Sequence, residues 1–293
     1  MNTQPTRYLD PKIDLAFKRI FGTRQHLLKS FLNALLPLPD DAPIESLEYL
    51  TPEQVPELPY LEKYSIVDVK CVDTKGRIFI VEMQMIWSAS FGQRIVFGGS
   101  QAYVKQLKEG QGYESLQPVY SLALVNSIFE PDSTDYYHHY KIVKVGAQER
   151  VLPWLQFVFI ELPKFKPETQ TAKRAAGLWL KFLNEIGSTA EQTPDAQLST
   201  EPEIVEALGL MQVSAFNEAE LRAYNHSLDE WRTHKALMHD SKAEGKAEGK
   251  AEGKAEGKAE GIQVVAKTMK SKGMDAATIA ELTGLSADEV EKL

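Results

Sequence analysis

Residues 65–84 read SIVDVKCVDTKGRIFIVEMQ, and this stretch decides the fold that the sequence predicts. Its two arms, residues 64–72 and 77–85, are rich in Val, Ile and Phe, which are typical of β-strands. The connection Asp73-Thr74-Lys75-Gly76 is a turn sequence, because Asp and Gly favour the backbone conformations that tight turns need. The stretch therefore predicts a β-hairpin.

The connection also sets the register of the hairpin. A type I turn followed by Gly76 in the left-handed region gives a three-residue loop with a bulge, which pairs Asp73 with Arg77. Counting back from that pair places Asp68 opposite Glu82. A two-residue loop would instead put the two acids on opposite faces of the hairpin. We favour the bulged loop.

Charged and polar side chains gather on one face in this register. Strand side chains alternate between faces, so Asp68 shares a face with Lys70, and Glu82 shares a face with Gln84. Two carboxylates opposite each other repel unless both are solvated, one is protonated, or a cation lies between them. Mg²⁺ is a cation that carboxylate oxygens hold. The alternative is a polar strand face that water solvates.

The flanking sequence extends the hairpin into an α/β fold. Helical spacing of apolar residues predicts helices within residues 10–36, and residues 90–109 predict another. Three further apolar stretches predict strands, over residues 44–50, 119–125 and 157–162. The predicted order begins with helix, three strands, helix, strand.

The C-terminal part has a different character. Residues 168–239 predict helices, and residues 242–261 are five copies of Lys-Ala-Glu-Gly. Each Gly costs a helix about 1 kcal/mol relative to Ala, so we interpret the repeat as a solvated spacer, part helix and part coil. An extended helix that associates with another chain is the alternative. We expect four parts: residues 1–165, 166–240, 241–261 and 262–293.

Residues 262–293 predict short helices around the turn Thr283-Gly284-Leu285, with a capping box at Ser286 and Glu289. This arrangement resembles a helix-turn-helix unit. The second helix, residues 286–293, holds three acids and one lysine, whereas base recognition uses Arg, Lys, Asn or Gln. Packing or oligomerisation is therefore favoured over DNA recognition, and we note a possible homo-oligomer through the repeat and tail.

Composition limits the class of protein. The chain has 293 residues and a net charge of −8, but residues 1–186 are neutral and residues 187–240 carry −7. An acidic total neither supports nor forbids contact with DNA, since affinity depends on where Lys and Arg lie. A single cysteine, Cys71, excludes an internal disulfide framework. No signal core and no apolar run long enough for a membrane span is found, so we expect a cytoplasmic protein.

Several ordered blocks resemble one known family. They are DPKIDLAFKRIFG at residues 10–22, DVK at 68–70, FIVEMQ at 79–84, and then Arg94, Tyr103, Gln106-Leu107, Gly110, Tyr113 and PVY at 118–120. The hairpin pattern is similar to that of the PD-(D/E)XK nuclease superfamily. More narrowly, the blocks, the repeat and the TGLS tail resemble the recombination-promoting nuclease (Rpn) and transposase-like family.

The resemblance implies a restriction-endonuclease-like core with a helical C-terminal appendage. It also implies an Mg²⁺-dependent DNA endonuclease in which Asp68 and Glu82 are metal ligands. Gln84 falls where the superfamily motif usually has Lys. A Gln side chain can orient a water molecule but cannot lower its pKa by charge, and Lys70 on the face of Asp68 could supply the missing positive charge. Lys70 is otherwise a surface strand lysine.

Four more residues are candidates for the site. Asp14 could be an outer ligand or could position water, although its spacing to Lys18 is also that of an ordinary i,i+4 ion pair. Lys18, Arg19 and Arg94 are candidate phosphate contacts, and each is otherwise a solvated charge.

Two rival interpretations stay open at this point. One is a DNA-binding module of the same ancestry with a weak or inactive site, and the other is an assembly protein driven by the repeat and tail. A nucleophilic role for Cys71 is disfavoured by its apolar neighbours. His138 and His139 are adjacent and point to opposite faces if extended, so a shared metal ion is disfavoured.

Overall fold

The computed structural model describes residues 6–50, 69–166, 168, 171, 173–189 and 192–293. The chain forms two compact units, residues 1–231 and 232–293. The helices and strands follow one another as α1 (Asp14–Phe21), α2 (Gln25–Leu35), β1 (Leu47–Tyr49), β2 (Val69–Asp73), β3 (Ile78–Gln84), α3 (Ala89–Val104), β4 (Val119–Val125), β5 (Tyr137–Lys144), β6 (Ala147–Glu161), α4 (Arg174–Glu185), α5 (Pro202–Met211), α6 (Glu218–Ser271), α7 (Ala276–Thr283) and α8 (Ala287–Lys292).

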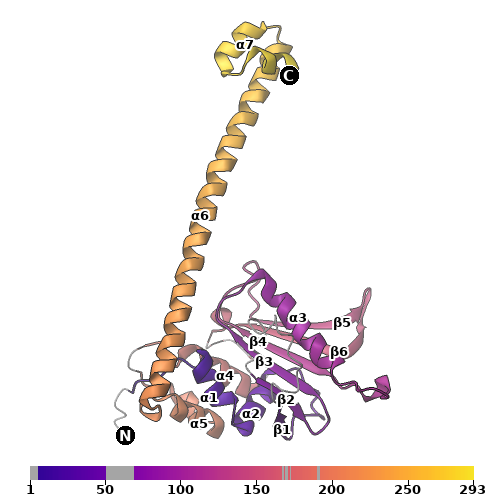
Figure 1. The fold of residues 1–293 in the computed structure, drawn as a ribbon, viewed down its shortest axis with the longest axis vertical. Helices are drawn as coiled ribbons and strands as arrows, with labels where there is room; N and C mark the ends of the chain where they lie inside the picture. The colour runs from indigo at the N-terminus through magenta and orange to yellow at the C-terminus, as the bar shows by residue number, and fades with distance from the viewer. Residues whose placement is uncertain (1–5, 51–68, 167, 169–170, 172, 190–191) are drawn as a thin grey trace. The chain divides into compact units, whose positions relative to one another are not determined.

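The first unit is built on one six-stranded sheet with the order β1-β2-β3-β4-β6-β5 (Figure 1). Strands β1, β2 and β3 are antiparallel, β3, β4 and β6 are parallel, and β5 returns antiparallel to β6. Strand β4 is buried along its whole length, as its uninterrupted apolar sequence predicts for a central strand. The predicted order of helix, three strands, helix and strand is therefore confirmed.

Helices cover the two faces of the sheet unequally. Helices α1, α2, α4 and α5 contribute Phe17, Phe31, Trp179 and many neighbours to one large apolar core, against the face that carries Val81. Helix α3 packs on the other face through two smaller clusters, which include residues such as Ile80. Since side chains alternate along β3, Glu82 and Gln84 lie on the face that α3 covers.

The predicted strands and helices differ from the observed ones mainly in length. The first strand has three residues, the helix predicted to residue 109 ends at Val104, and β6 begins at Ala147 rather than near residue 157. Strand β5 was not predicted at all. It lies at the edge of the sheet and is half-exposed or exposed throughout, so its sequence lacks the alternation that marks a half-buried strand.

Helix α3 approaches the sheet closely at Gly99. A Cβ atom there would lie 2.9 Å from Cε1 of Phe157 and 3.0 Å from Oγ of Ser121, whereas a Cβ on the adjacent Gly98 would meet nothing within 4 Å. The pair Gly98-Gly99 therefore serves packing on one side of the helix only.

This asymmetry gives a prediction with a built-in control. We expect Gly99→Ala to lower the free energy of unfolding by about 1–3 kcal/mol, because Phe157 must move in a packed core. Gly98→Ala should instead be neutral or stabilising by up to about 1 kcal/mol, through helix propensity alone. Urea denaturation of both variants checks the prediction, and equal stability of the two would contradict it.

Helix α6 runs without interruption through the Lys-Ala-Glu-Gly repeat (Figure 1). The sequence left the conformation of this repeat open, and the structure has all five copies helical. Helical residues flank the repeat on both sides, so no new nucleus is needed and the helix only has to propagate. The described Lys and Glu side chains from Glu248 to Glu260 are exposed.

The second unit ends in two short helices around a small apolar core of Ala266, Ile279 and Val290. The predicted capping box between Ser286 and Glu289 is present. The helix before it ends at Gly284, whose φ of +75° is easy for glycine alone. The predicted helix–turn–helix is confirmed in this unit.

Candidate active site

The β2–β3 turn fixes the geometry of the site. The backbone N–H of Asp73 donates to the carbonyl of Arg77 at 3.1 Å, and Gly76 has φ +76°. Val69 pairs with Val81 and Cys71 pairs with Phe79. The three-residue bulged loop and its register are therefore confirmed, and the two-residue alternative is wrong.

A buried ion pair holds this turn in place. Arg77 Nη2 lies 2.6 Å from Asp73 Oδ2, and their side chains are 7% and 1% exposed. The same guanidinium donates to the carbonyls of Ala42 and Pro43, while Asp73 Oδ1 accepts the backbone N–H groups of Lys75 and Arg77. The turn is thus tied to the segment that precedes β1.

The predicted partner of Glu82 precedes the first described residue of β2. Asp68 lies outside the described residues, so its position opposite Glu82 stays a prediction that the observed register supports. Lys70 pairs with Ile80 and therefore lies on the face of Glu82. Burial lowers the pKa of Lys70, and the positive charge of Lys105 lowers it further.

Glu82 is a carboxylate in an apolar place. The residue is only 8% exposed, and burial raises the pKa of its carboxyl from the ordinary value of 4.5 to about 7, against the opposing effect of Arg94. The nearest cation among the described residues is Arg94, with Nη2 at 3.9 Å from Oε2. A buried carboxylate that is this incompletely neutralised favours binding of a cation.

Arg94 reaches back from α3 to the end of β3. Its Nη2 donates to Oε1 of Gln84 at 2.8 Å, and Nε2 of Gln84 donates to the carbonyl of Ile86 at 2.6 Å. The guanidinium also lies over the ring of Phe91, with its carbon 5.0 Å from the centroid. The Gln84 amide is therefore held from both ends, and Arg94 places a positive charge beside both Glu82 and Gln84.

This arrangement was missed by the sequence, which offered Arg94 as a phosphate contact. The contact spans ten residues and depends on how the first turns of α3 cross the end of β3, which no local pattern encodes. One signal was available in the departure from the superfamily motif. A site with Gln84 in place of Lys needs a cation from elsewhere, and Arg94 supplies one.

The structure separates the other candidates from Glu82. Asp14 and Lys18 form the ordinary i,i+4 ion pair, 2.8 Å apart, on α1 over the opposite face of the sheet. Arg19 pairs with Glu220 at 2.6 Å, donates to the carbonyl of Ala215, and stacks over Phe216. No hydrogen bond or ion pair within the described ranges joins Asp14, Lys18 or Arg19 to the hairpin.

Two disfavoured chemistries find no support in the structure. Cys71 is buried, and burial raises the pKa of its thiol to about 12, which suppresses the nucleophilic thiolate. His138 contacts Glu161 at 2.9 Å, whereas His139 contacts Gln156 at 2.9 Å, so the two rings serve different partners. Within the described part of the chain, no group of three or more His, Cys, Asp or Glu residues is placed to hold a metal ion.

Comparison with known proteins gives two matches. The family described as PD-(D/E)XK nuclease family transposase matches residues 11–241, and the Rpn/YhgA-like nuclease family, C-terminal HTH domain, matches residues 260–293. No curated protein and no solved structure gives a significant match. Among the described helices none is both long and apolar enough to cross a membrane. The first match includes the hairpin and α3, and the second includes α7 and α8.

Proposed function

Since the chain belongs to the PD-(D/E)XK nuclease family transposases, we propose that it hydrolyses phosphodiester bonds of DNA at the Glu82 face of the β2–β3 hairpin. The observation that carries the proposal is the buried Glu82 carboxyl with its raised pKa, next to an amide and a guanidinium that are fixed by hydrogen bonds. Perturbed carboxyl groups of this kind concentrate at functional sites.

The donor set fits a divalent metal ion of the magnesium type. Glu82 and, in the predicted register, Asp68 would hold Mg²⁺ through carboxylate oxygens, which are the ligands that this ion prefers. When bound, Mg²⁺ stabilises charge on a phosphoryl group and lowers the pKa of a bound water. Cleavage requires the chain itself to keep Glu82 ionised and to exclude competing cations from its carboxylate.

The remaining residues divide the polar work of the site. Gln84 has one amide N–H and one oxygen lone pair left after its two hydrogen bonds, so it can orient the attacking water. Arg94 holds that amide in place and offsets the negative charge of Glu82. Lys70 lies on the same face as Glu82 and adds a positive charge toward a phosphate.

Plasmid cleavage tests the proposed function. Purified protein should nick a supercoiled plasmid with Mg²⁺ and not with a chelator, and Asp68→Ala and Glu82→Ala should each abolish nicking while the circular dichroism spectrum is unchanged. Glu48→Ala is the matched control, because Glu48 is an exposed acid on the neighbouring strand β1. No cleavage by the unaltered protein with any divalent metal would refute the proposal and favour a DNA-binding module.

Lys70→Met tests the relocated positive charge. We expect cleavage to fall about a hundredfold, as when one preorganised electrostatic contact is removed from a hydrolase. Lys108→Met, which removes an exposed lysine with no side-chain partner among the described residues, should leave the rate unchanged. Unchanged cleavage by a folded Lys70→Met protein would assign Lys70 to the strand surface alone.

The tail of the second unit is proposed to bind protein rather than bases. Helix α8 carries Asp288, Glu289 and Glu291, and its one lysine, Lys292, is at its end. Negative side chains on this helix disfavour the phosphate contacts that position a recognition helix on DNA. Deleting residues 241–293 should then change the mass measured by sedimentation while leaving plasmid nicking, and an unchanged mass would contradict it.

A further inference from the structure

The β5–β6 hairpin continues beyond the edge of the six-stranded sheet. Strand β4 pairs with β6 only from Leu155 onward, where Leu155 meets Val119. The pairing of β5 with β6 shifts at Lys141 and resumes as Ile142 with Leu152. Residues 141–152, here called the arm, therefore end in a two-stranded ribbon with no third strand beside it, and Figure 1 shows this end projecting past the other strands.

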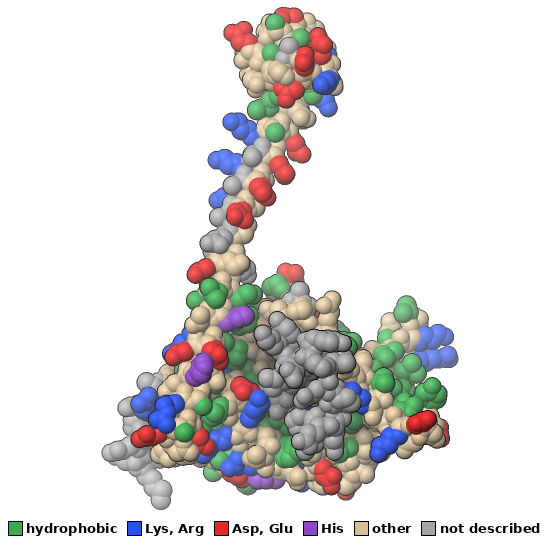
Figure 2. All heavy atoms as spheres, viewed as in Figure 1, with side chains coloured by type: hydrophobic (Ala, Val, Ile, Leu, Met, Phe, Trp, Pro, Cys, Tyr) green, Lys and Arg blue, Asp and Glu red, His purple; other side chains and the backbone are tan. Residues whose placement is uncertain are grey.

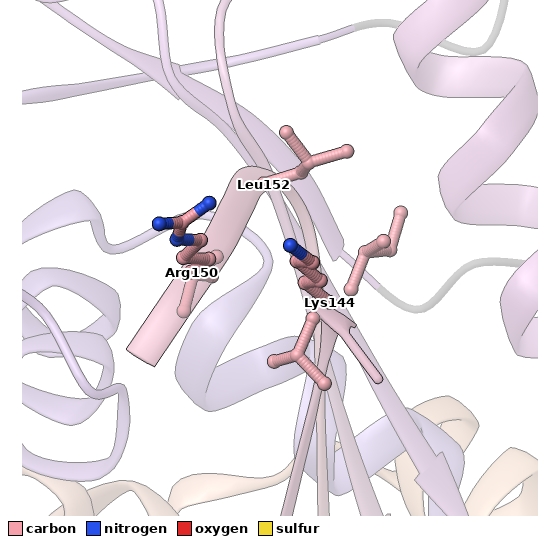
Figure 3. A pocket seen from close by; sticks show the side chains of 6 residues that line it. Lys144, Arg150 and Leu152 are labelled. Atoms are coloured by element: carbon pink, nitrogen blue, oxygen red, sulfur yellow. The ribbon is translucent and has the colours of Figure 1, made fainter. Parts of the chain in front are cut away.

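Apolar side chains on the arm are exposed to an unusual degree. Val145 at the tip is 95% exposed, and Ile142 and Leu152 are each about half exposed. A shallow cavity of about 310 Å³ lies on the arm and is lined from both strands by Ile142, Val143, Lys144, Arg150, Val151 and Leu152. Figure 3 shows Lys144 on one strand and Arg150 and Leu152 on the other.

The arm also has a positive charge in an acidic chain. Lys141, Lys144 and Arg150 against Glu149 give it a net charge of +2, whereas the net charge of the chain is −8. All three cations are exposed, and none forms a side-chain hydrogen bond or ion pair with any residue that the structure describes. Figure 2 shows blue and green side chains together on this projection.

We propose that the arm is a DNA-contacting ribbon that binds the phosphate backbone through Lys141, Lys144 and Arg150. Free cations on an otherwise acidic chain match a polyanion, and their contacts with phosphates are independent of sequence. A two-stranded β-ribbon fits the major groove of B-DNA, where its aliphatic side chains can meet thymine methyl groups. The inference rests on the proposed function in taking DNA as the ligand.

A second copy of the chain suits the arm less well. In a symmetric dimer the same patch meets itself, so the arm's positive charges would face one another and repel. The exposed aliphatic side chains alone would favour such a contact, and the experiment below therefore measures mass as well as binding.

The test measures DNA binding without cleavage. Protein carrying Glu82→Gln is titrated into a fluorescently labelled 30-base-pair duplex in chelator, at salt concentrations from 50 to 200 mM. Adding Lys141→Gln, Lys144→Gln and Arg150→Gln should reduce the slope of log affinity against log salt by about 2.7, which is about 0.9 for each phosphate contact. Protein with an intact arm should then lose about 40-fold more affinity over this salt range than the arm variant.

The control replaces two exposed lysines elsewhere, Lys75→Gln and Lys108→Gln, and should leave the slope unchanged. An arm variant with the slope of the intact arm would overturn the inference, as would a changed sedimentation mass with unchanged binding, which would assign the arm to a second copy. Binding that depends on the arm, in a protein whose unaltered form never nicks plasmid, would uphold the inference and defeat the proposed nuclease.

Discussion

Replacing Glu82 with Gln is expected to abolish DNA cleavage and, at the same time, to make the metal-free protein more stable above pH 7. The loss of cleavage should be at least about a hundredfold, because a metal ion supplies several kcal/mol of transition-state stabilisation and each 1.36 kcal/mol is tenfold in rate. The gain in stability follows from the pKa of Glu82, which burial raises to about 7.

The direction of the pH effect is set by that raised pKa. The folded protein holds a proton on Glu82 more tightly than the unfolded chain, so this contribution to stability is complete below about pH 4.5 and is lost as pH rises through 7. Above pH 7 an ionised, buried Glu82 destabilises the metal-free protein by about 1–3 kcal/mol. Gln at this position carries no charge at any pH.

Thermal unfolding in chelator at pH 5 and pH 8 measures the difference. Glu82→Gln and the unaltered protein should be similar at pH 5, and the variant should be the more stable at pH 8. Glu48→Gln serves as the control, since Glu48 is exposed on β1 and its replacement should change neither value. A variant that is less stable than the unaltered protein at pH 8 would show that Glu82 is satisfied by a partner in the folded state.

The second large effect is expected at the turn that sets the register. Arg77→Met should lower the free energy of unfolding by about 3–5 kcal/mol, because it leaves Asp73 as a buried and unpaired carboxylate. It also removes the hydrogen bonds to the carbonyls of Ala42 and Pro43. Urea denaturation gives the value.

Two further variants separate the charge from the shape of the turn. Asp73→Asn combined with Arg77→Met removes both charges and keeps an acceptor for the backbone N–H groups, so it should be more stable than Arg77→Met alone. Lys75→Met, on the exposed part of the same turn, should change stability by less than about 0.5 kcal/mol. A loss below about 1 kcal/mol for Arg77→Met would contradict a buried ion pair.

The sequence predicted the hairpin register because the information is local. Asp73, Gly76 and the alternating strands lie within twenty residues, and the loop length alone determines which residues are opposite. The order of the sheet elements was predictable for the same reason, since apolar runs such as residues 119–125 mark buried strands.

The parts that were not predicted depend on contacts distant in sequence. The contact of Arg94 with Gln84 requires α3 to cross the end of β3, and the anchoring of Arg19 by Glu220 joins residues about two hundred positions apart. The edge strand β5 lacks a pattern because so much of it is exposed. The helical state of the repeat depends on its helical flanks rather than on its own composition.

The continuous helix through the repeat makes the number of copies a geometric variable. Each Lys-Ala-Glu-Gly copy adds four residues, which is about 6 Å of rise and about 40° of rotation beyond a full turn. Gain or loss of one copy would therefore shift and turn the residues that flank the repeat within α6 without breaking the helix, and about nine copies would restore the original rotation. The repeat is thus an adjustable spacer with discrete steps, in which length and angle change together.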